Sequence, residues 1–349
     1  MNMLARVRPD LAGFQPYASA RRSGLVGTIR LNANESPWSG DGCPTGFNRY
    51  PDPQPLALRS DLAALYGVAE DRLWTGRGSD EAIDLLLRGF CRAGRDNVVG
   101  LAPSFGMYRI GAQLQGAEYR TLALRAEADF ALDPDRLLAL ADADTKLVIL
   151  CSPNNPTGEL HHDAIGHLAQ ALAGRALLVV DEAYIEFAGI PSTTALLDRY
   201  ENLVVLRTLS KAHALAGARI GSLIAHADVA RFIGSIAAPY PLPLPCVAAA
   251  VAALEPVALE RTHARIATLV AERGQLADAL ARLPRVRRVW PSAANFVLAR
   301  FDNGPAALER ALAAGIVLRD VSAQPGLDDC LRITVGSPYE NEALLEALA

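Results

Sequence analysis

Four short apolar runs, each followed at once by polar, glycine or proline residues, constrain the fold of this chain most. They cover residues 97–101, 146–150, 177–180 and 203–206. Runs of this length without polar alternation are typical of strands that are buried on both faces of a parallel sheet. Helix-length segments such as 104–114 and 163–172 lie between them. The alternation predicts an α/β fold, with a mostly parallel sheet flanked by helices.

The chain beyond residue 240 has a different pattern, which predicts a second domain. A helical segment, residues 256–283, precedes short strand-like runs and one more helix. These later segments are 287–290, 295–300, 305–314, 316–319 and 331–335. About 110 residues suffice for a small α+β domain. We therefore expect a large domain at 45–240, a small domain at 241–349, and an N-terminal arm, 1–44, that belongs to the small domain.

The charge of the chain argues against several classes of partner. Its formal net charge is −4 at pH 7, and its basic residues form no long run. Nucleic acids and anionic membranes attract clustered positive charge, so neither is expected as a partner. A small molecule is the expected ligand.

Export and membrane insertion are not predicted either. Met1 to Gln15 lacks the continuous apolar core of a signal peptide. The apolar stretch 233–254 contains four prolines within seven residues, which excludes a membrane helix and predicts an extended crossing before a buried helix at 246–254. Five cysteines without a CxxC pair predict reduced thiols in the cytoplasm, with neither a disulfide framework nor a metal site.

The ends of two neighbouring apolar runs carry an acid and an amine. Asp181 directly follows 177–180, and Lys211 comes shortly after 203–206. Ligands of open α/β sheets bind beyond the carboxyl ends of the strands. Alone, Asp181 would be interpreted as a turn or cap residue and Lys211 as a surface charge. Together they match the needs of pyridoxal phosphate, whose aldehyde takes an amine and whose ring nitrogen takes an acid.

A nearby cation supports this interpretation of Lys211. Arg219 follows it by eight residues, and a fixed positive charge combined with burial disfavours the ammonium form of a lysine. The free amine can then attack a carbonyl and form a Schiff base.

Two further loops carry candidate binding groups. Gly76-Arg-Gly-Ser-Asp-Glu81 precedes an apolar-periodic helix at 82–90, and such helix N-termini bind phosphate, although the same pattern also serves as a plain cap. Ser152-Pro-Asn-Asn-Pro-Thr-Gly158 holds two asparagines between prolines. That rigid loop either directs an amide to a ring oxygen or is a plain turn.

These motifs, in this order, resemble the fold-type I pyridoxal-phosphate aminotransferases. The resemblance rests on Ser152-Pro-Asn-Asn-Pro-Thr-Gly158, Asp181-Glu-Ala-Tyr184, Thr208-Leu-Ser-Lys211 and Arg219. Further sequence strings narrow the resemblance to the histidinol-phosphate aminotransferase family. These strings are Leu31-Asn-Ala-Asn-Glu35, Arg49-Tyr-Pro-Asp52, Gly76-Arg-Gly-Ser-Asp-Glu81, Ala183-Tyr-Ile-Glu-Phe187 and Ala238-Pro-Tyr-Pro241. The resemblance covers the chain from about Ile29 to the end.

The resemblance implies a role for each matching residue around the cofactor, pyridoxal 5'-phosphate. Lys211 would hold the cofactor as a Schiff base and move the proton between the substrate's α-carbon and the cofactor. Asp181 would pair with the pyridine nitrogen, and Phe105 would stack on the ring. Asn155 and Tyr184 would hydrogen-bond the ring oxygen. The expected phosphate ligands are the backbone amides of Ser79 and Asp80 and the side chains of Thr208, Ser210 and Arg219.

The resemblance also implies the substrates and a partner subunit. Arg332 and Arg319 would bind the substrate's anionic group, since a guanidinium suits both carboxylate and phosphate, and Asn34 would add a substrate contact. Tyr50 would reach the phosphate in the other subunit's site, which implies a homodimer with shared active sites. The implied reaction is transamination between L-histidinol phosphate and 2-oxoglutarate, which gives imidazole-acetol phosphate and glutamate in histidine biosynthesis.

Three positions depart from the family pattern. Phe105 replaces a frequent tyrosine, His213 stands where an apolar aromatic is expected, and Trp38 follows Pro37 where tyrosine or phenylalanine is usual. We expect Trp38 near the substrate entrance and His213 in the packed core.

Other functions stay open on the same scaffold. An aromatic amino-acid aminotransferase, or an amino-acid-phosphate decarboxylase, could use the same lysine and aspartate. A ligand-sensing module fused to a DNA-binding domain is disfavoured, because no basic helix-turn-helix segment precedes Leu31.

Overall fold

A seven-stranded sheet forms the centre of the larger part of the molecule. The computed structural model describes residues 3–15 and 29–349. Strands follow the order β1 (Leu73–Arg77), β7 (Ile220–Ala225), β6 (Leu203–Thr208), β5 (Leu177–Asp181), β4 (Thr145–Cys151), β2 (Asn97–Ala102), β3 (Glu118–Ala123). All neighbours are parallel except β7, which runs antiparallel to both β1 and β6. The predicted mostly parallel α/β sheet is therefore confirmed.

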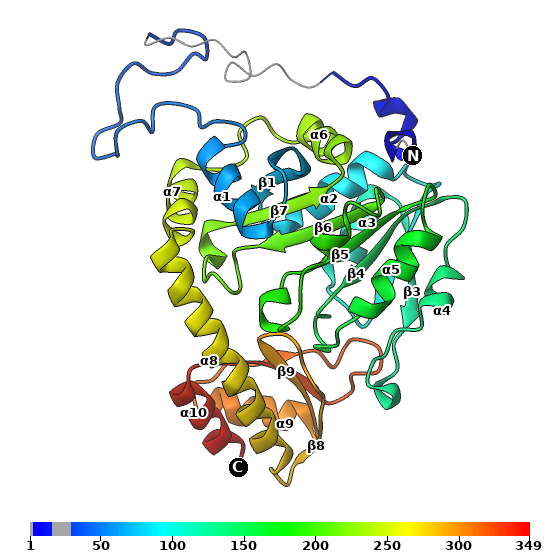
Figure 1. The fold of residues 1–349 in the computed structure, drawn as a ribbon. Coiled ribbons are helices and arrows are strands. Elements are labelled where there is room, and N and C mark those ends of the chain that lie inside the picture. The colour runs from blue at the N-terminus through cyan, green and yellow to red at the C-terminus, as the bar shows by residue number, and fades with distance from the viewer. Residues whose placement is uncertain (1–2, 16–28) are drawn as a thin grey trace.

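Helices cover both faces of this sheet (Figure 1). One face packs against α1 (Leu56–Tyr66), α5 (His162–Ala171) and α7 (Leu244–Ala253). The other packs against α2 (Ser79–Phe90), α3 (Met107–Gln115) and α6 (Ala227–Ile236). The short helix α4 (Pro134–Leu138) contacts α5 and β3. Because successive strand side chains point to opposite faces, β6 gives Val205 to the first core and Val204 to the second.

A second, smaller sheet lies at the far end of a long helix (Figure 1). Its four strands follow the antiparallel order β10 (Arg319–Asp320), β11 (Cys330–Thr334), β9 (Phe296–Phe301), β8 (Val286–Val289). Helices α8 (Pro256–Ala281), α9 (Gly304–Ala313) and α10 (Pro338–Leu348) pack against it around a third core. The predicted smaller α+β unit is confirmed, while the domain boundaries at residues 45 and 241 stay a prediction.

Several local expectations are corrected. The strand expected at 316–319 shrinks to the two residues of β10, and the helix expected at 104–114 starts only at Met107. The helix expected to be buried at 246–254 is α7, of which only Ala250 is buried, since one side of it packs on this chain and the other is open. The sequence predicts no strand at β7, because Gly221 and Ser222 interrupt its apolar run.

The described start of the N-terminal arm lies on the large sheet's helices. The 3-10 helix Met3–Arg6 contacts α6, and Arg8 N donates to Gly89 O at the end of α2 (3.0 Å). Residues from Ile29 onward form an extended trace over the same end of the molecule (Figure 1). Within residues 3–15 and 29–349, none of the helices has the length and apolar character needed to cross a membrane.

Candidate active site

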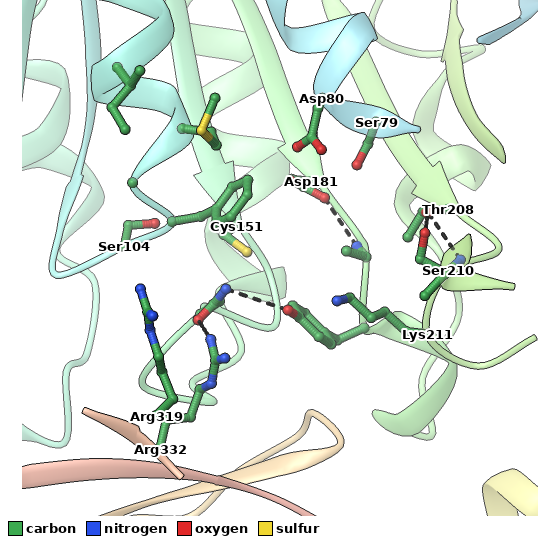
Figure 2. Close-up of a pocket in the computed structure, with 18 of the residues that line it drawn as sticks. Ser79, Asp80, Ser104, Cys151, Asp181, Thr208, Ser210, Lys211, Arg319 and Arg332 are labelled. Atoms are coloured by element: carbon green, nitrogen blue, oxygen red, sulfur yellow. Dashed lines mark hydrogen bonds between the residues drawn. The ribbon is translucent and has the colours of Figure 1, made fainter. Parts of the chain in front are cut away.

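A cavity of about 560 Å³ opens between the carboxyl ends of β4, β5 and β6 and the four-stranded sheet. Strand pairing brings the acid and the amine to the same edge, because β5 and β6 are adjacent and parallel and Asp181 lies opposite Leu206. The predicted site residues that line the cavity are Ser79, Asp80, Phe105, Asn155, Asp181, Tyr184, Thr208, Ser210, Lys211, Arg219, Arg319 and Arg332. Figure 2 shows Arg319 and Arg332 entering from the small sheet, opposite Ser79 and Asp80.

Asp181 is the buried acid of the site, with 3% of its surface exposed. Its Oδ1 accepts a hydrogen bond from Ala183 N (3.1 Å), and its Oδ2 accepts one from the Tyr108 hydroxyl (2.7 Å). Burial raises the pKa of Asp181 to about 6, while these two donors act in the opposite direction. The carboxylate can therefore exist at neutral pH inside the protein, ready to pair with a cation.

Lys211 presents its amine to the same cavity (Figure 2). Burial lowers the pKa of Lys211, and the charge of Arg332 lowers it further, whereas Asp181 and Asp80 oppose this. Arg219, the cation expected from the sequence, contributes less than Arg332, and its guanidinium is paired with Asp80 at 3.2 Å. A lysine in such surroundings supplies a nucleophilic amine.

One end of the cavity gathers groups that can bind an anion. Arg219 adopts a left-handed backbone (φ 57°), and its Nη1 donates to the Ser210 hydroxyl at 3.4 Å. The Thr208 hydroxyl donates to the Ser210 hydroxyl at 2.9 Å. Helix α2 points its N-terminus here, and within the described chain no side chain caps it. Free amides at a helix start, two hydroxyls and a guanidinium are the groups that bind phosphate.

A glycine keeps space open at this end of the cavity. Gly78 precedes α2 with φ +82°, and a Cβ there would stand 2.6 Å from Arg219 Nη2. A side chain at this position would fill the space between the helix start and the guanidinium.

The opposite end of the cavity carries a chain of polar contacts. Arg332 Nη1 donates to Asn155 Oδ1 (2.6 Å), and Asn155 Nδ2 donates to the Tyr184 hydroxyl (3.4 Å). Among the described residues, none accepts from the buried Nε of Arg332. Arg319 lies directly opposite Arg332 in the β10–β11 register. Two guanidinium groups, one of them with the Arg332 Nε–H available as a donor, favour the binding of an anionic group here.

Two predicted residues lie outside this cavity. Tyr50 is half exposed and stacks on Tyr240, with ring centroids 4.5 Å apart. Asn34 is exposed with a left-handed backbone (φ 56°). Their roles stay predictions that need a second subunit. Trp38, expected near the entrance, is 79% exposed on the same arm, and His213 is buried as expected.

Sequence reasoning missed part of the cavity wall. Gln324 and Val321 come from the loop between β10 and β11, and Met107 and Ile110 come from α3. No motif singled them out. Tyr108 was also missed as a partner of Asp181, because it stands in the first turn of α3 and no local pattern relates it to the end of β5.

The donor set fits pyridoxal phosphate. A nucleophilic amine, a buried carboxylate, an amide–phenol pair and a phosphate cradle match the aldehyde, ring nitrogen, ring oxygen and phosphate of that molecule in turn. Together with the mostly parallel sheet, the site defines a pyridoxal-phosphate enzyme of fold type I.

Comparisons with known proteins agree with this class. The family model described as aminotransferase class I and II matches residues 31–348. A histidinol-phosphate aminotransferase from Stenotrophomonas maltophilia (strain R551-3) is 51% identical, covering 100% of this chain and 97% of the relative. Another, from Xanthomonas euvesicatoria pv. vesicatoria (strain 85-10), is 52% identical, covering 99% of this chain and 97% of the relative.

A solved structure extends the likeness to three dimensions. It is a histidinol-phosphate aminotransferase from Sinorhizobium meliloti in complex with pyridoxal-5'-phosphate, with a TM-score of 0.77 at 28% identity, covering 86% of this chain and 82% of that one. The chain belongs to the class I and II aminotransferases, and within them to the histidinol-phosphate aminotransferase family.

Proposed function

We propose that this protein transfers the amino group of L-histidinol phosphate to 2-oxoglutarate, giving imidazole-acetol phosphate and glutamate, with pyridoxal phosphate as cofactor. The observation that carries the proposal is one cavity holding Lys211 and Asp181 in its middle, a phosphate cradle at one end and the Arg319–Arg332 pair at the other. Relatives of this name at 51% and 52% identity support the choice of substrate.

The bound cofactor would supply an aldehyde that accepts an amino group and a ring that draws electrons from the substrate's α-carbon. Asp181 would hold the ring nitrogen in its protonated form. The Lys211 amine would remove the proton from the substrate's α-carbon and deliver it to the cofactor. This step needs an uncharged amine, which the burial of Lys211 favours.

The remaining residues would bind and orient. Ser79, Thr208, Ser210 and Arg219 would hold the cofactor phosphate. Arg332 and Arg319 would hold the substrate's anionic group, which is a phosphate in histidinol phosphate and a carboxylate in glutamate. Such binding fixes the reacting carbon beside the Lys211 amine.

We extend the proposal to a homodimer in the cytoplasm. Tyr50 lies outside the cavity of its own chain and stacks on Tyr240. Helix α7, which begins shortly after Tyr240 in the sequence, is apolar in composition and has one exposed side. Both features are consistent with a second subunit that completes each site. All five cysteines are free, as expected for a reducing compartment.

Chemical labelling tests the proposal sharply, because the chain contains only two lysines, Lys146 and Lys211. Borohydride treatment of the protein loaded with pyridoxal phosphate should fix the cofactor to Lys211, as read by peptide mass mapping. Lys211→Ala should lose the label, the visible absorbance and glutamate formation.

Lys146→Arg is the matched control, since Lys146 lies 3.6 Å from Asp96 and arginine preserves that ion pair. It should keep both label and turnover. Label on Lys146 in the wild type, or turnover by Lys211→Ala, would refute the proposal.

A further inference from the structure

Tyr108 is a buried phenol that contacts residues of the cavity wall without lining the cavity itself. It lies on α3, with none of its surface exposed, and its side chain packs in the core between α2, α3 and the sheet. It does not line the cavity. Its hydroxyl nevertheless donates to Asp181 Oδ2 at 2.7 Å.

Asp181 is thereby held from two directions. The Tyr108 hydroxyl reaches Oδ2 from α3, and Ala183 N reaches Oδ1 from the turn after β5. Each carboxylate oxygen can accept more than one hydrogen bond, so both keep a free lone pair. Two donors on two different elements fix the rotamer of the carboxylate, and hydrogen bonds to the charged form favour that form.

The same tyrosine also supports the aromatic residue at the cavity wall. The Phe105 ring meets the Tyr108 ring edge-on, with centroids 5.5 Å apart and planes at 83°. Tyr108 therefore contacts both Asp181 and Phe105, the two residues that the family resemblance places against the cofactor ring.

We propose that Tyr108 is a positioning residue, whose hydroxyl holds Asp181 ionised and in one rotamer for the ring nitrogen of the cofactor. The inference rests on the proposed function, because that nitrogen belongs to pyridoxal phosphate. Without the hydroxyl, Ala183 N would be the one hydrogen-bond donor left to the buried carboxylate among the described residues. Burial would then favour the neutral form of Asp181, which does not stabilise a protonated ring nitrogen.

Cofactor affinity separates this role from a structural one. The probes are pyridoxal phosphate and an analogue with carbon in place of the ring nitrogen, each titrated into apo protein. In Tyr108→Phe, which keeps the ring and its contact with Phe105, affinity for pyridoxal phosphate should fall about tenfold, as for loss of a hydrogen bond to a charged group. Affinity for the analogue should stay at the wild-type value, because the analogue has no nitrogen for Asp181.

Tyr200→Phe is the matched control, since Tyr200 is a buried phenol away from the cavity. It should bind both probes like the wild type. Equal losses for both probes in Tyr108→Phe, or no loss at all, would overturn the inference. Failure of the wild type to bind pyridoxal phosphate would refute the proposed function and this inference with it.

An infrared measurement gives a readout that needs no variant of Tyr108. The difference spectrum between apo wild type and Asp181→Asn at about pH 7.5 should contain the bands of an ionised carboxylate, since hydrogen bonds to the charged form favour it. The band of a protonated carboxyl group would overturn the inference, even if Tyr108→Phe did not fold.

Discussion

Lys211 and Asp181 owe their chemistry to neighbours that lie far away in the sequence. The strongest charge effect on Lys211 comes from Arg332, more than a hundred residues downstream, and the short hydrogen bond to Asp181 comes from Tyr108. The sequence predicts the acid and the amine, because both follow recognisable strands. It cannot rank Arg332 above Arg219 or find Tyr108, because those relations depend on distances that no local pattern encodes.

The effect of burial on the pKa of a single side chain, His161, can be tested through the stability of the protein. The His161 ring is 3% exposed, and among the described residues neither ring nitrogen has a hydrogen-bond partner. Burial lowers the pKa of His161 to about 4. Because this folded-state pKa lies below the unfolded value of about 6.5, the folded protein is penalised as pH falls from about 6.5 towards 4.

We predict that apo wild type loses about 2 kcal/mol more stability than His161→Leu between about pH 7.5 and pH 5. The free energy of unfolding in urea, measured for both proteins at both pH values, checks this. Comparing the two proteins cancels the other titrating groups. An equal loss in wild type and variant would show that the ring is not held neutral by burial.

At the scale of elements, the strands predicted by continuous apolar runs are those buried on both faces. β2, β4, β5 and β6 were expected for that reason. The sequence does not predict β1, β3 or β7, because glycine, serine or other polar residues interrupt their apolar runs. Those interruptions have a structural role: Gly221 of β7 pairs with Gly76 of β1 and with Thr208 of β6, directly beneath the start of α2.

Gly221→Ala should damage the proposed phosphate cradle, formed by the start of α2, Thr208, Ser210 and Arg219. A Cβ at this position would stand 2.2 Å from both Gly78 C and Ser79 N, so the backbone at the start of α2 must move. We expect affinity for pyridoxal phosphate to fall by about tenfold or more, since the amides that face the phosphate shift with it. Titration of apo protein followed by visible absorbance measures the effect.

Gly274→Ala provides the control, because Gly274 lies on α8 in open space. It should leave cofactor affinity unchanged and raise stability by up to about 1 kcal/mol, as alanine favours a helix. Equal cofactor affinities in the two variants would contradict the assignment of the cradle.

At the scale of the whole molecule, most residues at 29–44 of the arm and one side of α7 are exposed in the single chain. The burial expected for α7 from its apolar composition is absent here, although the helix is confirmed. Composition reports how apolar a segment is but not which surface covers it. The placement of Tyr50 on Tyr240, outside the cavity, fits the same picture.

Mixed dimers test whether sites are shared. We predict that Tyr50→Ala and Lys211→Ala, each inactive or nearly so alone, regain activity when combined in one dimer. Such a dimer contains one site with an intact Lys211 and an intact Tyr50 from its partner, so about half of the wild-type activity per dimer should return. Co-expression with two different tags and purification on both isolates the mixed species. Absence of recovery, or a monomer in sedimentation, would exclude shared sites.

The most direct test of the central claim is the fate of the amino group. With 2-oxoglutarate as acceptor, kcat/KM should be highest for L-histidinol phosphate and lower for phenylalanine. Each histidinol phosphate consumed should yield one glutamate, and a phosphorylated amino acid should release no carbon dioxide. A preference for phenylalanine, or carbon dioxide released from a phosphorylated amino acid, would contradict the claim that this cavity transaminates histidinol phosphate.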